Sequence, residues 1–279
     1  MKPLKLLLLP LAIASTLAFV GCSDNDDDNT LDKTVDVTFR PTIDAEITRA
    51  IADGSAADQL VVVVFDEAMN QLSCQTIEMA TATTQGVKLP LVPAMSYKIL
   101  FWAQHADNGA YTIADDGTVS IDYTPFANAG FSGMENLDAF CATVDITVSG
   151  SSTSDVALHR PLAQINFADA TTAPTAATDK ATVTLKGVAT AYNPFTSTAS
   201  GSADATFTFN DFTDETLIAD GTTYYYVATA YAFAPATERI DADYSFAQSE
   251  TVVRSSSFSS IPVTRNKRTN IVGNIVTSE

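Results

Sequence analysis

Histidine, cysteine and tryptophan are scarce in this chain of 279 residues, which contains two, three and one of them respectively. With only His105 and His159 available, a zinc site with several imidazole ligands is excluded, and a Ser-His-Asp triad has few candidates for its base. The chain also has no phosphate-binding glycine loop, no H-E-x-x-H motif and no dinucleotide-binding glycine fingerprint. We therefore expect no enzyme, no catalytic residue, no metal and no cofactor.

Basic residues are also few, with 15 lysines and arginines against 33 acidic residues and a net charge of −18. Without residues 1 to 21, which hold two lysines and no acid, 13 basic residues would face 33 acidic ones, a net charge of −20. Such a polyanion repels nucleic acid and anionic lipid headgroups, so neither is an expected partner. The 46% hydrophobic content is enough to build real cores, and the length fits one large or two ordinary domains.

Only one long hydrophobic run occurs, and it lies at the start of the chain. Lys2 and Lys5 precede an apolar core from Leu6 to Val20, and the small residue Gly21 follows it. These are the three parts of a secretory signal, and the apolar core is too short for a confident membrane span. The pattern predicts a signal peptide over residues 1–21.

Cys22 follows this run directly. The segment Phe19-Val20-Gly21-Cys22 resembles a bacterial lipobox, although Phe19 stands where that motif usually has leucine. The resemblance implies lipidation of Cys22 by a fatty acid such as palmitate, and hence an anchor in the cell outer membrane. The acidic run from Ser23 to Asp28 resembles the surface-export tag of Bacteroidetes lipoproteins. A solvated acidic tether over residues 22–33 is the plainer interpretation of the same run.

Beyond residue 33, strand patterns alternate with turn signals, and no long helical period occurs. Val35–Arg40 alternates apolar and polar residues, whereas Leu60–Phe65 is apolar throughout and fits a central strand covered on both faces. The one helix candidate is Ser132–Phe140, where Ser132 and Glu135 have capping-box spacing. The expected fold is all-β, with two tandem antiparallel β-sandwich domains. Further strands are expected at 97–103, 144–148, 163–167, 181–185, 205–209, 223–231, 244–246, 261–264 and 270–276.

Two polar stretches are candidate breaks between these strands. Residues 149–157 are small and polar, which predicts a boundary between an N-terminal domain over 34–156 and a C-terminal domain over 157–279. The Thr171–Lys180 stretch is rich in Thr, Ala and Pro, and we expect it to join two paired strands.

Three further groups of residues were considered as sites. Cys74 and Cys141 could pair in an exported protein, or both could be free thiols. Several aspartates and one glutamate could bind calcium through oxygen ligands, but solvated loop charge is the stronger interpretation. The aromatic residues could form a sugar-binding platform, although strand alternation favours core packing with one tyrosine facing out. The carboxylates are Asp241, Asp243, Asp211, Asp214 and Glu215, and the aromatics are Trp102, Tyr224, Tyr225 and Tyr226.

Four segments in series, within residues 34 to 276, resemble the fimbrillin-type lipoproteins of Bacteroidales. The resemblance implies a pair of transthyretin-like or Ig-like β-sandwiches that serve in type V pili, or in a related surface adhesin or anchor. Its implied partners are other pilus subunits, and its implied location is the cell surface. The four segments are Ser96–Ala103, Asn136–Cys141, Leu158–Phe167 and Arg265–Asn274.

The resemblance further implies cleavage by an arginine-specific protease near the start of the first domain. Ile47-Thr48-Arg49-Ala50 stands at a matching place, and a cut between Arg49 and Ala50 would release the strand Val35–Arg40 together with the lipid. The strand position thus vacated would be filled by a donor strand from another subunit. An ordinary exposed loop arginine is the alternative for Arg49.

The chain stops at Glu279, soon after the last expected strand, whereas the resemblance implies a donor segment beyond that strand. We therefore expect an accessory or terminal subunit rather than a bulk stalk subunit. Two other functions stay open. One is a lipid-anchored module that binds a glycan or a host protein without polymerising. The other is a surface hydrolase, which would need two acidic side chains about 5 to 10 Å apart in a cleft.

Overall fold

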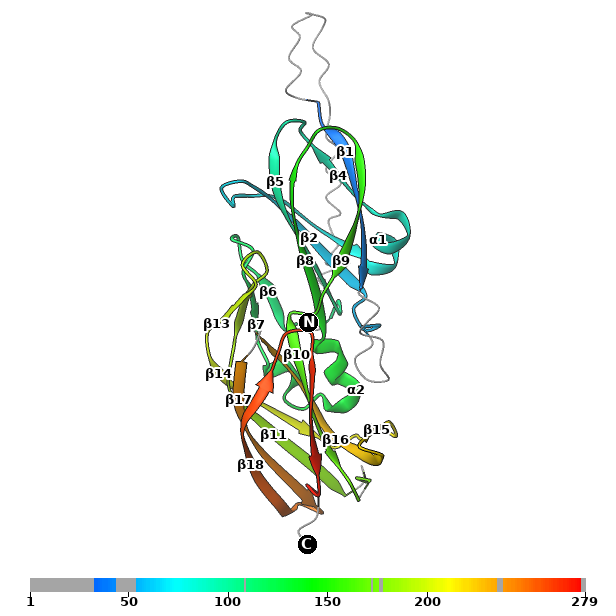
Figure 1. Cartoon of the computed structure of the whole chain (residues 1–279), viewed down its shortest axis with the longest axis vertical. Helices are drawn as coiled ribbons and strands as arrows, with labels where there is room; N and C mark the ends of the chain where they lie inside the picture. Colours follow the sequence, from blue (N-terminus) through cyan, green and yellow to red (C-terminus); the bar gives the residue numbers. More distant parts are fainter. Residues whose placement is uncertain are drawn as a thin grey trace, which may run out of the picture. The chain divides into compact units, whose positions relative to one another are not determined.

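The computed structural model describes residues 33–43, 54–107, 109–171, 173–175, 178–234 and 238–276, which all belong to one compact unit (Figure 1). Strands dominate these residues, and helices are few and short. Two strand pairings are parallel, β1 with β9 and β10 with β19, and the other described ladders are antiparallel. The predicted all-β, mainly antiparallel sandwich fold is confirmed.

Two sheets built from residues 35 to 158 face one another. One has the strand order β4-β1-β9 and the other β3-β2-β5-β8. Side chains of both sheets share one buried cluster that includes Phe39, Val62 and Phe101. The apolar run Leu60–Phe65 lies in β2 between β3 and β5, as predicted for a central strand. The bounds are β1 Val35–Ile43, β2 Gln59–Asp66, β3 Gln71–Glu78, β4 Val87–Leu91, β5 Ser96–Gln104, β8 Ala139–Thr147 and β9 Ser152–Leu158.

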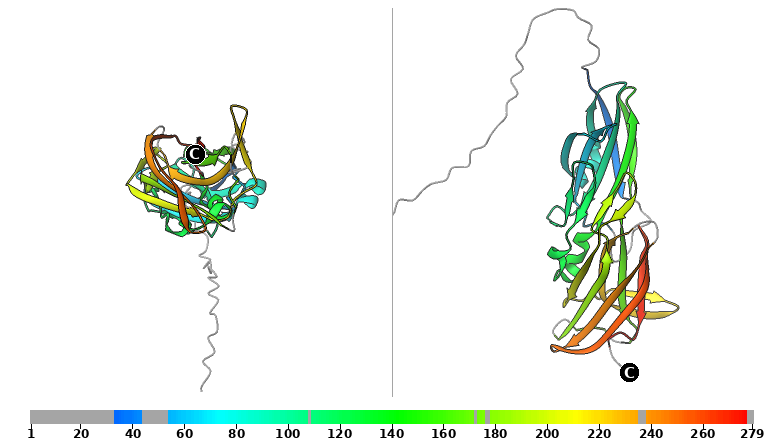
Figure 2. Two further views of the ribbon diagram at one scale, coloured as in Figure 1. Left: turned by 90° about the horizontal axis from the view of Figure 1, so that it is seen from below. Right: turned by 90° about the vertical axis from the view of Figure 1, so that its left-hand side faces the viewer.

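Two further sheets are built from residues 162 to 273, with strand orders β15-β16-β10-β19 and β14-β11-β17-β18. Figure 2 shows the long hairpin of β17 and β18 along this part of the molecule. Because β10 and β11 lie in different sheets, the prediction that residues 171–180 join two paired strands was wrong. The bounds are β10 Leu162–Asp169, β11 Asp179–Val188, β14 Ala203–Phe209, β15 Thr216–Ala219, β16 Thr222–Phe233, β17 Glu238–Gln248, β18 Thr251–Val263 and β19 Arg268–Gly273.

A small sheet of order β13-β12-β7-β6 joins residues on both sides of the predicted domain boundary. Its bounds are β6 Tyr111–Ile113, β7 Val119–Ile121, β12 Ala191–Asn193 and β13 Thr198–Ser200. Aromatic pairs also join the two parts of the chain, because Trp102 lies 6.3 Å from Phe233 between ring centroids and Phe65 lies 5.6 Å from Phe195. The predicted boundary itself falls inside β9, and the division into two domains stays a prediction.

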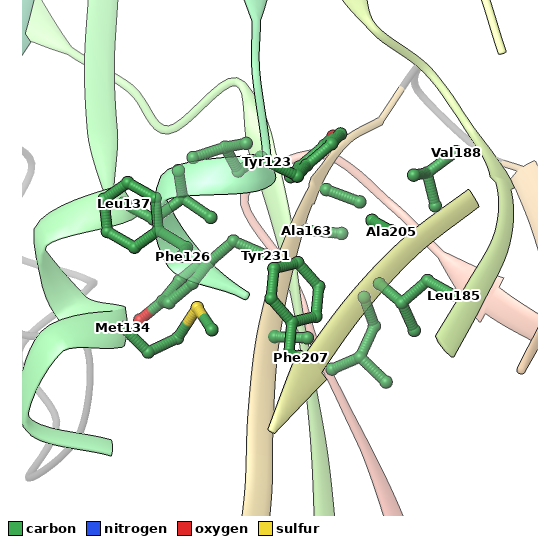
Figure 3. Packing of buried hydrophobic residues seen from close by; sticks show 14 of the residues in the cluster. Tyr123, Phe126, Met134, Leu137, Ala163, Leu185, Val188, Ala205, Phe207 and Tyr231 are labelled. Atoms are coloured by element: carbon green, nitrogen blue, oxygen red, sulfur yellow. The ribbon is translucent and has the colours of Figure 1, made fainter. Parts of the chain in front are cut away.

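The described residues form four short helices, α1 Met79–Gln85, η2 Thr124–Phe126, α2 Gly130–Met134 and η3 Glu135–Leu137. The predicted helix Ser132–Phe140 is therefore partly wrong, since the helical stretch starts at Gly130 and residues 139 and 140 already belong to β8. Met134 and Leu137 reach from this stretch into the core beside Phe207 and Tyr231 (Figure 3). Among the described residues, no helix has the length and apolar character needed to cross a bilayer.

Asp211, rather than a capping box, supplies the hydrogen bonds at the start of α2. Its carboxylate accepts hydrogen bonds from the backbone N–H of Phe131 at 2.7 Å and from the Ser132 hydroxyl at 2.7 Å. Gly130 has φ 65°, and a Cβ there would lie 1.8 Å from Asp211 Oδ1, so the close approach requires glycine. The local spacing of Ser132 and Glu135 could not reveal a cap that comes from 79 residues away.

Candidate functional site

Strand β1 lies in the middle of its sheet, with β4 on one side and β9 on the other (Figure 1). Five residue pairs, from Val35 with Leu91 to Phe39 with Val87, form the antiparallel ladder to β4. Seven pairs, from Val37 with Ser152 to Ile43 with Leu158, form the parallel ladder to β9. Both edges of β1 are thus hydrogen-bonded to neighbours.

One face of β1 supplies apolar side chains to the core of the first two sheets. Val37 and Phe39 are 0% exposed, and the Phe39 ring centroid lies 5.3 Å from that of Phe101 in the facing sheet. Asp36 and Arg40, on the opposite face, are exposed. This alternation is the period-2 pattern that the sequence predicted for the strand.

Removal of β1 would therefore expose two kinds of surface at once. The backbone N–H and C=O groups of β4 and β9 that now face β1 would lose their partners, which is costly unless water or another strand replaces them. The cavities that hold Val37 and Phe39 would also open, and each fully buried side chain of this kind contributes roughly 1.5–3 kcal/mol through burial. The slot would accept an extended segment with apolar residues at alternate positions.

Cys22, Arg49 and Ala50, the predicted lipidation and cleavage residues, lie outside the described residues. The strand that precedes Arg49 is longer than predicted, because β1 ends at Ile43 rather than at Arg40. The sequence reasoning missed both neighbours of β1. The alternation in Val87–Leu91 is a signal that could have found β4. The Ser- and Thr-rich start of β9, by contrast, resembles a linker.

Cys74 and Cys141 are both free thiols, so the alternative of a disulfide between these two residues is excluded. Cys74 is exposed on β3, whereas Cys141 is buried on β8. Burial raises the pKa of the Cys141 thiol to about 12, although Arg265 nearby opposes the rise. The Cys141 thiol is therefore protonated at neutral pH.

Both histidines have partners on the backbone of the chain. Nδ1 of His105 accepts a hydrogen bond from the backbone of Asp107 at 3.3 Å. The backbone of His159 pairs with that of Cys141 through hydrogen bonds of 2.9 and 3.0 Å, while the His159 side chain is exposed.

Three of the five carboxylates considered for calcium, Asp211, Asp241 and Asp243, have protein partners, whereas Asp214 and Glu215 are exposed. Asp243 lies on β17, where it accepts a hydrogen bond from Ser257 and forms an ion pair with Lys186. Asp241, on the same strand, accepts from the backbone of Ser260. These two aspartates were expected to be solvated loop charge; they are exposed, as expected, but they lie on a strand rather than in a loop, and Asp211 acts as the cap described above. Within the described ranges, no group of three or more His, Cys, Asp or Glu could hold a metal ion.

A buried ion pair that the sequence did not predict joins the start of β8 to the residues after β9. Arg160 Nε and Nη2 each donate to the Asp138 carboxylate at 2.6 Å, and both side chains are almost fully buried. The Arg160 guanidinium also lies 5.0 Å above the Phe140 ring. Two parallel bonds fix the guanidinium in one orientation, so this pair determines how the chain turns from β9 toward β10.

Trp102 and the tyrosine run are mainly core residues. Trp102 is 0% exposed and Tyr226 is buried, while Tyr224 and Tyr225 are half-buried. The preference for core packing over a sugar-binding platform is thus confirmed for Trp102 and Tyr226.

Several solved structures share this fold at low sequence identity. A candidate polysaccharide-binding protein from Bacteroides thetaiotaomicron VPI-5482 aligns with a TM-score of 0.56 and 11% identity over 88% of this chain and 92% of that chain. A candidate adhesin from Bacteroides ovatus aligns with a TM-score of 0.55 and 13% identity over 87% of this chain and 92% of that chain. A candidate adhesin from B. thetaiotaomicron VPI-5482 aligns with a TM-score of 0.54 and 11% identity over 80% of each chain. No curated protein sequence matches the chain. A family model matches residues 28–279, and the chain therefore belongs to the family of unknown function DUF6562.

Proposed function

We propose that this protein is a structural or accessory subunit of a cell-surface fimbrium, exported as a lipoprotein and assembled by strand addition after proteolysis. The observation that carries the proposal is the position of β1, a central strand with buried Val37 and Phe39 that directly precedes the segment containing Arg49. Candidate adhesins from Bacteroides with the same fold support a role at the cell surface.

Cleavage at Arg49 would convert β1 from a covalent part of the fold into a separate segment. Water adds across the peptide bond between Arg49 and Ala50, and β1 is then held only by its two ladders and its apolar contacts. A strand from another subunit that offers the same alternation can replace it. Addition in one direction joins subunits head to tail in an open filament.

The test is digestion of the purified protein with an arginine-specific protease. We expect a new N-terminus at Ala50 in the mass spectrum. We also expect the cleaved protein to bind a synthetic peptide with the sequence of Val35–Ile43, because the vacated slot fits it. Uncleaved protein should not bind the peptide, since its own β1 occupies the slot.

Two variants make the test specific. Arg49→Gln should resist the protease and stay unable to bind the peptide. Arg40→Gln is the matched control, because Arg40 is an exposed arginine inside β1 and its backbone pairs with that of Asp155 in β9. Cleavage at Arg49 without gain of peptide binding would contradict the assembly mechanism.

A lipid-anchored adhesin that never loses β1 is the alternative function. Mass spectrometry of the mature N-terminus from intact cells separates the two. An acylated Cys22 on the surface protein favours the permanent anchor, whereas an N-terminus at Ala50 favours the fimbrial subunit. Both functions use the fold as a scaffold, and neither requires catalysis.

A further inference from the structure

A pocket of about 570 Å³ opens where β8, the end of β9, the residues after β12 and the turn between β18 and β19 meet. Cys141 and His159 line it from the first part of the chain, and Tyr192, Arg265, Asn266 and Lys267 line it from the second part. No residue of β1 lines the pocket, although its lining residue Ala157 on β9 pairs with Thr42 of β1.

The charge of this pocket is opposite to that of the protein. Arg265 and Lys267 line it, and no acidic residue is among its described lining residues. Elsewhere the lysines Lys98, Lys180 and Lys186 form ion pairs with carboxylates. In the part of the chain that the structure describes, neither Arg265 nor Lys267 forms an ion pair, although acidic residues outnumber basic ones by 33 to 15.

The other titratable groups in the pocket leave its positive charge intact. Burial raises the pKa of Tyr192, and the Cys141 thiol is protonated at neutral pH as described above, so both side chains are neutral there. The Tyr192 hydroxyl accepts a hydrogen bond of 2.6 Å from Arg265 Nη1. This bond fixes the guanidinium while leaving its other N–H groups to donate elsewhere.

Asn266 is a polar residue in the lining, and it lies in the turn that also carries Arg265 and Lys267. Its Oδ1 atom is buried and has no hydrogen-bond partner among the described residues. Its backbone N–H bonds to the carbonyl of Leu162 at 3.0 Å, which holds the turn in place.

We propose that this pocket binds a sugar residue that carries a carboxylate, such as a uronic acid. The carboxylate would contact Arg265 and Lys267, because a guanidinium can bind both of its oxygens. The lining residues Thr143 and Ser197 add further hydroxyl groups, which suits a saccharide better than an apolar peptide side chain. The proposal is independent of the fimbrial function, because it needs neither cleavage nor assembly.

The experiment is calorimetric titration of the purified protein with glucuronate and, separately, with glucose, which has the same ring without the carboxylate. We expect glucuronate to bind and glucose to bind at least about tenfold more weakly. Arg265→Gln and Lys267→Gln should each weaken glucuronate binding severalfold. Lys180→Gln is the matched control, since Lys180 lies on β11 outside the pocket, and it should leave the affinity unchanged.

Lys267→Gln keeps the test decisive if Arg265→Gln disturbs the fold, because the exposed Lys267 side chain forms no hydrogen bond or ion pair with the described residues. Equal binding of glucose and glucuronate would overturn the proposal, as would absence of glucuronate binding or unchanged affinity in Lys267→Gln. Tighter binding of an acidic dipeptide than of glucuronate would overturn the assignment to a sugar.

Discussion

Strands β1 and β10 have the same type of neighbours but differ in how they are held. Each is paired on one side with an antiparallel strand, β4 or β16, and on the other with a parallel strand, β9 or β19. Each also contributes a fully buried phenylalanine to a core, Phe39 in β1 and Phe167 in β10. The similarity ends at the remaining side chains.

Every residue of β10 is buried, and its polar side chains are bonded to the neighbouring strands. The Asn166 carboxamide accepts a hydrogen bond from the Thr229 hydroxyl at 2.8 Å and donates one to Asn270 at 2.9 Å. At the end of the strand, Asp169 Oδ2 accepts from the backbone N–H groups of Ile275 and Val276 at 2.6 and 2.8 Å. Such bonds connect β10 to β16, to β19 and to the residues after β19.

Strand β1 has no comparable connections among the described residues. Its inner face contributes apolar side chains and its outer face is largely solvated. A strand held by backbone ladders and apolar contacts can be replaced by any strand of the same alternation, whereas a strand held by specific side-chain bonds cannot. The difference supports the proposal that β1, rather than β10, is the strand that exchanges.

The largest expected effect comes from removing the two phenylalanines. Phe167→Ala should lower the free energy of unfolding by about 3–5 kcal/mol, because it leaves a cavity beside Tyr244 and Phe258. Phe39→Ala should act more locally, as faster hydrogen exchange of β1, β4 and β9 with a smaller shift of the global denaturation midpoint. Equal global shifts in the two variants would show that β1 is no more separable than β10.

Arg160→Gln tests the ion pair at the turn that leads into β10. The change leaves the buried Asp138 carboxylate without its charged partner. We therefore expect the free energy of unfolding, measured by urea denaturation, to fall by about 3–5 kcal/mol. The exposed pair of Lys98 and Asp145 supplies the control, because Lys98→Gln should lower the free energy of unfolding by no more than about 1 kcal/mol. A small effect of Arg160→Gln would mean that water reaches Asp138.

Asp169→Asn tests the connection between β10 and the residues after β19. An amide has only one accepting oxygen, so the hydrogen bonds from Ile275 and Val276 would compete with those from Thr171. We therefore expect the free energy of unfolding to fall by about 1–3 kcal/mol. Hydrogen exchange at Ile275 and Val276 should increase. Asp115→Asn, in an exposed turn, should change neither quantity.

The smallest effect concerns Asp211 and depends on pH. Burial alone would raise the pKa of Asp211, but the hydrogen bonds from Ser132 and Phe131 outweigh it and lower the pKa below its ordinary value. The carboxylate therefore stabilises the fold above about pH 4, and this contribution disappears as pH falls through the folded-state pKa. Asp211→Asn should reduce the melting temperature at pH 7 and have less effect near pH 2. An unchanged pH profile would contradict this role.

The sequence predicted most of the long strands, because their residues alternate or are apolar throughout. It predicted β2 as a central strand and Val35–Arg40 as a half-buried one, and it favoured a core position for Trp102. It missed β9, whose Ser-rich start carries no apolar period, and it misread the start of α2, whose cap is Asp211. Both depend on residues far away along the chain.

Composition and local pattern by themselves determined the all-β class, the strong negative charge and the positions of the main strands. These properties follow from side-chain chemistry and from the period of two residues in a strand. Only the tertiary structure decided that β1 lies between β4 and β9, that Asp138 meets Arg160, and that Arg265 and Lys267 line a pocket without acidic residues. Such placements depend on pairing and packing between distant segments, for which the local sequence carries no signal.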